Sequence, residues 1–248
     1  MRYFDPQALE RLKRDVRRAP SGFRYGFVRG IFREDVYEAV MAGFPDVTGF
    51  RLKDLKEGNA GGGRKRFYVG QEYYSGRDYG ATRKFSGVAD IWREIIAEAD
   101  SEEFKSLLHD ATGVPLNSVC NLGFAYGKEG SVQEAHIDGA VSDMGKSISA
   151  SVACLLYLNK EPGGVCGTRV YAPDRTTVLF EVPDLRNSFF FFEQHPAAWH
   201  GFPEVPAGAD RRIVSLSYSH EPVPIRLHDS FLYSKMPLRV KKLLQRVG

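Results

Sequence analysis

The sequence predicts an α+β fold in which helices come first and an antiparallel β-sandwich or jelly roll follows. Up to residue 115, most segments with a regular pattern repeat their apolar residues at helical spacing. After Pro115 the apolar runs become short, β-branched or aromatic, and turn residues separate them. Because no helical segment interrupts these later runs, we expect them to form antiparallel strands.

Four helices are expected in the first part. Asp5 and Pro6 precede apolar residues at positions 9, 12 and 16, which is typical of a capped amphipathic helix that ends near Pro20. Further helices are predicted over residues 33–43, 88–99 and 102–112, and Gly113 followed by Pro115 is typical of a helix end. Residues 59–82 combine glycines, arginines and tyrosines without a helical period, so they are expected to form either a surface hairpin or a lid over a substrate.

Six strands are expected after Pro115, and a final segment over residues 236–247 has a helical pattern. We therefore expect one domain, with mostly helical support and a possible lid (1–115), a jelly-roll catalytic core (116–220) and a C-terminal segment (221–248). The expected strands are Val119–Tyr126, Ser149–Leu158, Thr168–Tyr171, Thr177–Val182, Ser188–Phe192 and Arg212–Ser219.

Composition narrows the class of protein. A hydrophobic content of 43% is that of a folded globular chain. The net charge is only +3, and the 34 basic and 31 acidic residues are mixed along the chain, so we expect no nucleic-acid partner. No apolar run resembles a secretion signal or a membrane span. Three cysteines without paired spacing argue against disulfides, and a cytoplasmic location is expected.

Three residues have the types and spacing of a metal site. His136 and Asp138 are two positions apart, so in an extended strand both side chains point to the same side. His200 follows the apolar run at residues 189–192. Two imidazoles and one carboxylate form the facial triad of non-haem Fe(II) oxygenases, which leaves coordination positions open.

An arginine pair near the end of the expected core supplies a carboxylate-binding group. Arg211 and Arg212 begin the last predicted strand, and a guanidinium binds a carboxylate through a planar pair of hydrogen bonds. Strand alternation lets only one of the two face inward, and either one fits this role.

From about residue 119 to 219 the chain resembles the Fe(II)- and 2-oxoglutarate-dependent dioxygenases, particularly their prolyl-hydroxylase-like branch. The resemblance implies a double-stranded β-helix, another name for this jelly roll, with a helical lead-in. Its motifs, in order, are Tyr126, His136-Ile137-Asp138, Tyr157-Leu158-Asn159, Gly163-Gly164, the four phenylalanines at 189–192, His200 and Arg212.

The resemblance also implies roles for individual residues. His136, Asp138 and His200 would bind Fe(II). Arg212, preferred over Arg211 because Tyr218 follows it by six residues, would bind the distal carboxylate of 2-oxoglutarate with help from the Tyr157 hydroxyl, and Tyr126 would lie beside the cosubstrate near the metal.

The implied activity is O2-dependent hydroxylation of an unactivated C–H bond in a small molecule or an amino-acid-like substrate, with release of succinate and CO2. The presence of Asp138 favours hydroxylation over halogenation, since halogenating members lack this carboxylate. Two alternatives stay open: a non-catalytic jelly-roll metal-binding protein, and a peptidyl-prolyl hydroxylase that acts on a protein. The basic and aromatic segment 64–79 suggests an anionic or ring-containing ligand, with Arg64 and Arg66 as candidate contacts.

Overall fold

The structure of the protein is a computed structural model. It describes residues 1–55, 63–74, 88–117, 119–138, 150–163 and 165–219, and within these ranges the side chains of residues 71–74, 120, 121 and 150 are left undescribed. The C-terminal segment expected to be helical (236–247) lies outside the described ranges, and so do residues 59–62 and 75–82 of the segment expected to form a hairpin or a lid.

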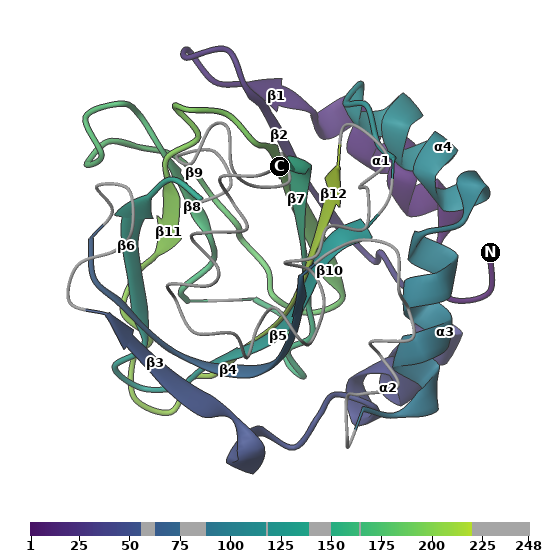
Figure 1. Cartoon of the computed structure of the whole chain (residues 1–248), viewed down its shortest axis with the longest axis horizontal. Helices are drawn as coiled ribbons and strands as arrows, with labels where there is room; N and C mark the ends of the chain where they lie inside the picture. Colours follow the sequence, from purple (N-terminus) through teal and green to yellow (C-terminus); the bar gives the residue numbers. More distant parts are fainter. Residues whose placement is uncertain (56–62, 75–87, 118, 139–149, 164, 220–248) are drawn as a thin grey trace, which may run out of the picture.

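One antiparallel sheet forms the body of the fold, and it curls until its two halves face each other (Figure 1). The strand order is β1-β2-β10-β7-β12-β5-β4-β6-β11-β8-β9, and β3 pairs with β4 outside this path. The strands are β1 (Arg17–Arg18), β2 (Arg24–Arg29), β3 (Arg51–Leu55), β4 (Lys65–Tyr74), β5 (Val119–Gly127), β6 (Val132–His136), β7 (Ala150–Tyr157), β8 (Arg169–Tyr171), β9 (Val178–Glu181), β10 (Ser188–Glu193), β11 (His200–Phe202) and β12 (Arg211–Ser219).

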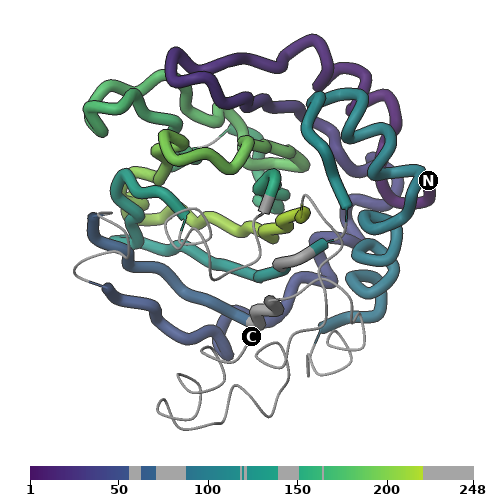
Figure 2. Tube along the Cα trace, turned by 45° about the horizontal axis from the view of Figure 1, so that its top comes forward, coloured from purple at the N-terminus to yellow at the C-terminus, as the bar shows by residue number. Residues whose placement is uncertain are grey.

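The helices lie together on one side of the curled sheet (Figure 2). They are α1 (Pro6–Asp15), α2 (Glu34–Ala42), α3 (Asp90–Ala99) and α4 (Glu102–Thr112), with a short 3-10 helix at Val47–Gly49. Local chemistry fixes their ends. The Asp5 carboxylate accepts the Gln7 N–H at the start of α1, the Ser101 hydroxyl accepts the Phe104 N–H at the start of α4, and Gly113 ends α4 with φ +69°.

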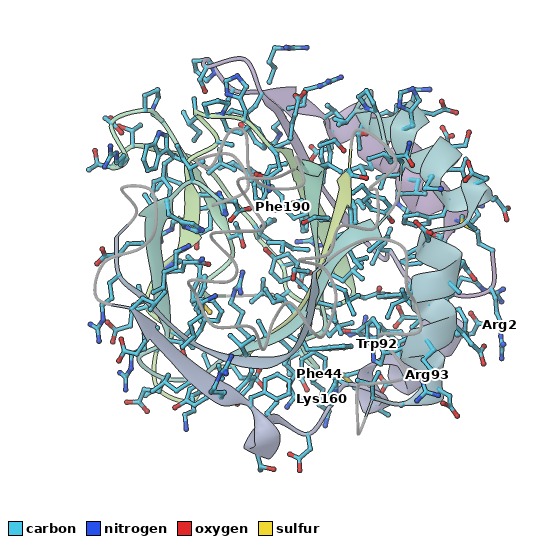
Figure 3. The ribbon with its side chains drawn as sticks, viewed as in Figure 1. Arg2, Phe44, Trp92, Arg93, Lys160 and Phe190 are labelled. Carbon is cyan, nitrogen blue, oxygen red and sulfur yellow. The ribbon has the colours of Figure 1, made fainter. Side chains whose placement is uncertain are left out.

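Strand alternation divides the apolar residues into two cores. On β12, Val214, Leu216 and Tyr218 face the helices, whereas Ile213 faces the inside of the curled sheet. Figure 3 shows Trp92 between α3 and the sheet and Phe190 inside the curl. The Trp92 ring is fully buried and packs edge-on against Phe124, with ring centroids 5.4 Å apart. The helices thus cover the outer face of the central strands, and the candidate functional site described below lies on the inner face of the same strands.

The predicted jelly-roll core and the four predicted helices are confirmed, with small shifts of their ends. The expectation that residues 1–115 are mostly helical is incomplete, because this part also contributes strands β1–β4 to the sheet. The strands β6 and β11 were also not predicted. They are short, and the sequence of β6, Val-Gln-Glu-Ala-His, has little β-branched or aromatic content. None of the described helices is long and apolar enough to cross a membrane.

Candidate metal centre and pocket

Two short paired strands create the centre of the site. His136 is the last residue of β6 and His200 is the first residue of β11, and the two are direct partners in the antiparallel register. Their ring centroids are 4.2 Å apart. Asp138 follows the end of β6 by two residues, which brings its carboxylate to the same place. The β6–β11 pairing therefore brings His200 next to His136 and Asp138, from which it is distant in sequence.

The distances between the three side chains suit a single metal ion. Asp138 Oδ1 lies 3.5 Å from His136 Nε2 and 3.5 Å from His200 Nε2. The three ligand atoms all lie within 4.8 Å of one another. Neighbouring ligands about 2.1 Å from an octahedral ion are about 3 Å apart, so the two carboxylate–imidazole pairs are near this spacing and the three side chains would move closer together around an ion. In the described part of the chain, this is the one group of His, Cys, Asp and Glu side chains with such geometry.

Backbone carbonyls fix the orientation of both imidazoles. His136 Nδ1 lies 3.1 Å from the Glu134 carbonyl oxygen, and His200 Nδ1 lies 2.9 Å from the Ala198 carbonyl oxygen. Because a carbonyl only accepts hydrogen bonds, each Nδ1 carries a proton, and Nε2 is the ring nitrogen that lies near Asp138 in both residues. Metal-binding histidines in proteins are held in this way. The Gln133 side-chain amide also lies 3.0 Å from His136 Nε2.

The charge state of the triad matches that of a ligand set. Burial lowers the pKa of His136 to about 4, and the nearby His200 contributes to this shift, so His136 is neutral at physiological pH. Burial acts to raise the pKa of Asp138, but the two neighbouring imidazoles outweigh it and hold the pKa well below its usual range. A neutral His136 and an ionised Asp138 are in the protonation states that ligands of a divalent cation need.

Gln194 supports the carboxylate from behind. Its Nε2 donates a hydrogen bond of 2.7 Å to Asp138 Oδ2, which leaves Oδ1 facing the two imidazoles. This residue directly follows β10. In the sequence, Gln194 stands two residues after the four phenylalanines at 189–192. Its residue type alone did not mark it as part of the site.

Close packing of β11 on β6 depends on Gly201. A Cβ at this position would lie 2.2 Å from the Gln133 carbonyl oxygen and 2.9 Å from the Glu134 carbonyl oxygen. Such contacts are far too short for any side chain, so glycine lets the strand that carries His200 approach the strand that carries His136.

Arg211, and not Arg212, faces the inside of the curled sheet. Its guanidinium is buried, and it donates from Nε to the Cys166 carbonyl at 3.1 Å and from Nη2 to Thr168 Oγ1 at 2.7 Å. It also lies over the Phe202 ring, 4.2 Å from the centroid. In the described part of the chain no carboxylate forms an ion pair with it. A buried guanidinium with only neutral partners is a binding group for an anion.

The preference for Arg212 is therefore wrong. Its Nε donates to Asp210 Oδ2 at 3.1 Å, and 36% of its side chain is exposed. The aromatic residue that favoured it, Tyr218, has the same strand parity and belongs to the core beneath the helices, where its hydroxyl donates to the Ala99 carbonyl. Both residues thus occupy the face of β12 opposite to the site.

Tyr157 occupies the inner face, close to Arg211. Its ring centroid is 5.4 Å from the Arg211 guanidinium carbon, and its hydroxyl donates to Thr168 Oγ1 at 2.6 Å. Burial raises the pKa of Tyr157, opposed by the charge of Arg211, so the hydroxyl remains a donor. Thr168 thus accepts hydrogen bonds from both Tyr157 and Arg211, and it fixes the guanidinium in place.

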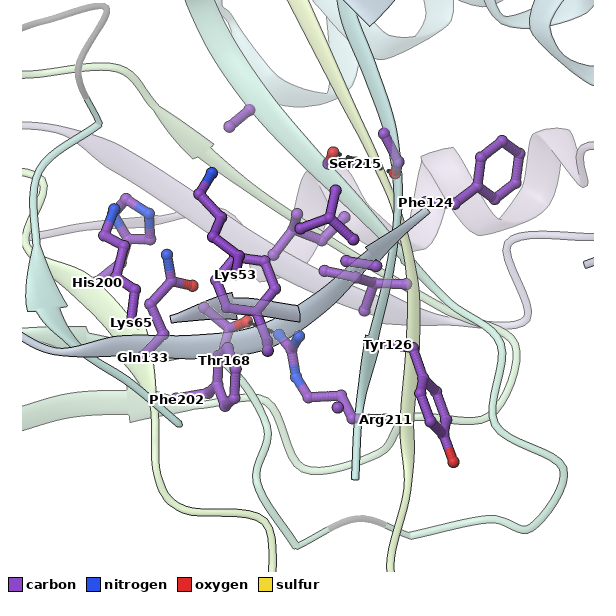
Figure 4. A pocket seen from close by; sticks show the side chains of 18 of the residues that line it. Lys53, Lys65, Phe124, Tyr126, Gln133, Thr168, His200, Phe202, Arg211 and Ser215 are labelled. Carbon is purple, nitrogen blue, oxygen red and sulfur yellow. Dashed lines mark hydrogen bonds between the residues drawn. The ribbon is translucent and has the colours of Figure 1, made fainter. Parts of the chain in front are cut away.

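Tyr126 is among the residues that line the pocket, but its ring points away from it. It is the register partner of Arg212 on the face of the sheet opposite to the site, and its ring lies 6.4 Å from the Tyr68 ring. Figure 4 shows Tyr126 pointing away from Arg211, on the other side of the strands. The ring has this direction because Tyr126 has the same parity as Phe124, which faces the helices, and the structure therefore gives no support for a contact of the Tyr126 ring with the cosubstrate.

A single pocket contains Asp138, His200 and Arg211 (Figure 4). Its wall is partly aromatic, with Phe67, Phe192 and Phe202, and the Phe192 ring lies 4.2 Å from the His200 ring. Two lysines, Lys53 on β3 and Lys65 on β4, also line it. The lysines, Thr168, Gln133 and Gln194 were not singled out from the sequence, because their contact with the site depends on strand pairing.

The fold of the chain is that of the 2-oxoglutarate- and Fe(II)-dependent oxygenases. A prolyl-4-hydroxylase from Pseudomonas putida is 14% identical with a TM-score of 0.51, over 85% of this chain and 98% of that chain. A 2OG-Fe(II) oxygenase family oxidoreductase from Burkholderia pseudomallei is 13% identical with a TM-score of 0.54, over 80% and 86%. The α-ketoglutarate-dependent epimerase SnoN from nogalamycin biosynthesis is 18% identical with a TM-score of 0.53, over 87% and 84%.

At these levels of identity the likeness shows the fold. No protein-family model matches the sequence, and no curated protein matches it.

Proposed function

We propose that the protein is an Fe(II)- and 2-oxoglutarate-dependent dioxygenase that hydroxylates a C–H bond of a small organic substrate. The observation that carries the proposal is one pocket lined by Asp138 and His200, which cluster with the buried His136, and by the buried guanidinium of Arg211, which has no carboxylate partner among the described residues. Iron together with 2-oxoglutarate and dioxygen would supply the oxidising chemistry, with one oxygen atom entering the substrate and the other entering succinate as CO2 leaves.

The residues of this chain would bind and position the reactants. His136, Asp138 and His200 would hold the metal through Nε2, Oδ1 and Nε2. Arg211 would bind the distal carboxylate of 2-oxoglutarate, with Thr168 and Tyr157 holding the guanidinium in place. This assignment replaces the one expected for Arg212.

Other side chains would protect the reaction centre. The rings of Phe192 and Phe202 border His200 and Arg211, and they would keep water from the metal side of the pocket. Gln194 would keep Asp138 Oδ2 occupied, so that the carboxylate binds the ion through Oδ1 alone.

A structural zinc site has less support. Closed zinc sites use four ligands and are rich in cysteine. Cys154 belongs to the core beneath the helices, where burial raises the pKa of its thiol, and Cys166 contacts Arg211 through its carbonyl. Among the described residues the cluster has three ligands, which leaves positions for a cosubstrate.

The test is succinate release from 2-oxoglutarate in the presence of Fe(II), O2 and a panel of small metabolites and proline-containing peptides. We expect Fe(II)-dependent turnover that His136→Ala abolishes and that His195→Asn preserves. His195 lies near the site in sequence, and its Nδ1 accepts the Ala197 N–H, a role that asparagine can fill. Failure of the wild-type protein to bind Mn(II) and 2-oxoglutarate together would refute the proposal. Turnover stimulated only by the peptides would indicate a peptidyl hydroxylase instead.

A further inference from the structure

The pocket contains two cations that the proposed chemistry does not use. Lys53 on β3 and Lys65 on β4 both line it and are both partly buried. In the β3–β4 register Lys53 pairs with Phe67 and Leu55 pairs with Lys65, so the two lysines occupy neighbouring positions on one face of the hairpin. Lys65 is also the register partner of Gln133 on β6, which brings it close to the metal ligands. Figure 4 shows both side chains in the pocket with His200 and Arg211.

The charges in the loaded pocket do not cancel. Fe(II) carries two positive charges and 2-oxoglutarate two negative ones, and the charges of Arg211 and Asp138 cancel each other. Among the described lining residues Asp138 is the sole acidic group. In the same part of the chain neither lysine forms an ion pair. Two positive charges therefore remain beside the space that a substrate would fill.

The surroundings of Lys65 show that these charges are costly in the absence of a ligand. Burial lowers the pKa of Lys65 to about 8. The charge of Lys53 contributes to this shift, while the charge of Asp138 opposes it. Coordination of a cation by Asp138 would remove much of that compensation. A pair of adjacent, partly desolvated ammonium groups without a carboxylate is stabilised by an anion that enters from outside.

The neighbouring arginines do not share this position. Arg64 is exposed, and Arg66 lies 3.7 Å from Asp54 on the opposite face of the hairpin. Arg64 and Arg66, the candidate contacts for an anionic or ring-containing ligand, are thus not among the residues that line this pocket, because strand alternation directs Lys65 inward and its two neighbours outward.

We propose that Lys53 and Lys65 form a subsite for an anionic group of the organic substrate, a carboxylate or a phosphate. This inference rests on the proposed function, because it assumes that Arg211 binds the cosubstrate. It narrows the substrate class to organic acids whose target carbon lies within reach of the metal while their anionic group contacts the β3–β4 hairpin.

The test uses the full chain loaded with Mn(II), which does not support turnover, and saturated with 2-oxoglutarate. Calorimetric titrations at low ionic strength compare benzoate with benzamide and hexanoate with hexanamide, and phenyl phosphate distinguishes phosphate from carboxylate recognition. We expect at least one anion to bind ten-fold or more tightly than its neutral counterpart, with phenol as the counterpart of phenyl phosphate. Lys65→Met and Lys53→Met should each remove most of this preference. Arg66→Met, which removes one positive charge from the same strand on its outer face, should retain it.

Several outcomes would overturn the inference. These are equal binding of acids and amides, a preference that survives in the Lys53→Met/Lys65→Met double variant, and binding of none of the anions. A loss of 2-oxoglutarate affinity in Lys65→Met would assign that lysine to the cosubstrate and also overturn it. If the wild-type protein binds Mn(II) and 2-oxoglutarate but shows no preference for acids, only this inference fails, whereas absence of Mn(II) and 2-oxoglutarate binding refutes the proposed function itself. Thermal unfolding of each variant checks that it is folded.

Discussion

Replacement of Arg211 by methionine should separate cosubstrate binding from stability. The guanidinium is buried, and its hydrogen-bonding partners, the Cys166 carbonyl and Thr168 Oγ1, are neutral. Methionine fills much of the same volume and leaves no buried charge. We therefore expect the free protein to be as stable as the wild type or more stable, since an uncompensated buried charge is unfavourable.

The expected loss of 2-oxoglutarate affinity is large. Removing one partner of a buried, hydrogen-bonded charge pair costs about 2–5 kcal/mol. At about 1.4 kcal/mol for each factor of ten, a loss near 3 kcal/mol weakens binding on the order of a hundred-fold. Arg212→Met is the matched control, because its exposed pair with Asp210 contributes about 0–1 kcal/mol to stability and lies outside the pocket.

The assay is thermal unfolding and calorimetry of both variants with Mn(II), with and without 2-oxoglutarate. Arg211→Met should lose the 2-oxoglutarate-dependent rise in Tm, and Arg212→Met should keep it. The reasoning would be refuted if Arg212→Met lost 2-oxoglutarate binding while Arg211→Met retained it. It would also be refuted if Arg211→Met were destabilised by several kcal/mol in the free state, because the guanidinium would then be mainly structural.

Three further predictions concern other parts of the site. Gln194→Leu removes the hydrogen bond to Asp138 Oδ2 and should weaken Mn(II) binding about 10- to 100-fold, as measured by calorimetry. The Tm of the metal-free protein should change little. Unchanged metal affinity would show that this hydrogen bond does not orient the carboxylate. Gly201→Ala places a Cβ against the Gln133 carbonyl and should separate β11 from β6. We expect the free energy of unfolding, measured in urea, to fall by about 1–3 kcal/mol and metal binding to weaken. Wild-type values for both quantities would contradict the close-packing argument. Because folding lowers the pKa of Lys65 from 10.5 to about 8, its burial destabilises the protein below pH 8, and this penalty is relieved as the pH rises from about 8 to 10.5. Amine labelling followed by mass spectrometry should therefore modify Lys65 with a midpoint near pH 8, and a midpoint near 10.5 would argue against its burial in the pocket.

Much of the fold follows from local features of the sequence. The first helix is set by Asp5 and Pro6 at its start, and α4 is set by Ser101 at one end and Gly113 at the other. These signals act over a few residues, so they can be recognised without knowledge of the fold. The short runs after Pro115 similarly predicted the jelly roll. The strands β3 and β6 were missed because they are polar or charged at many positions, and pairing with neighbours, not local preference, makes them strands.

The sequence by itself determined the types of side chain in the candidate metal centre. Two histidines and an aspartate at this spacing, with an arginine pair after them, were enough to predict the triad, and the β6–β11 pairing brings the three residues together. Only the tertiary structure decided which cations face the site. A shift of one residue in register turns every side chain of a strand to the other face. The sequence therefore cannot show whether Arg211 or Arg212 faces the pocket, or whether Lys65 or Arg66 does. Pairing with the neighbouring strands fixes the register and decides both cases.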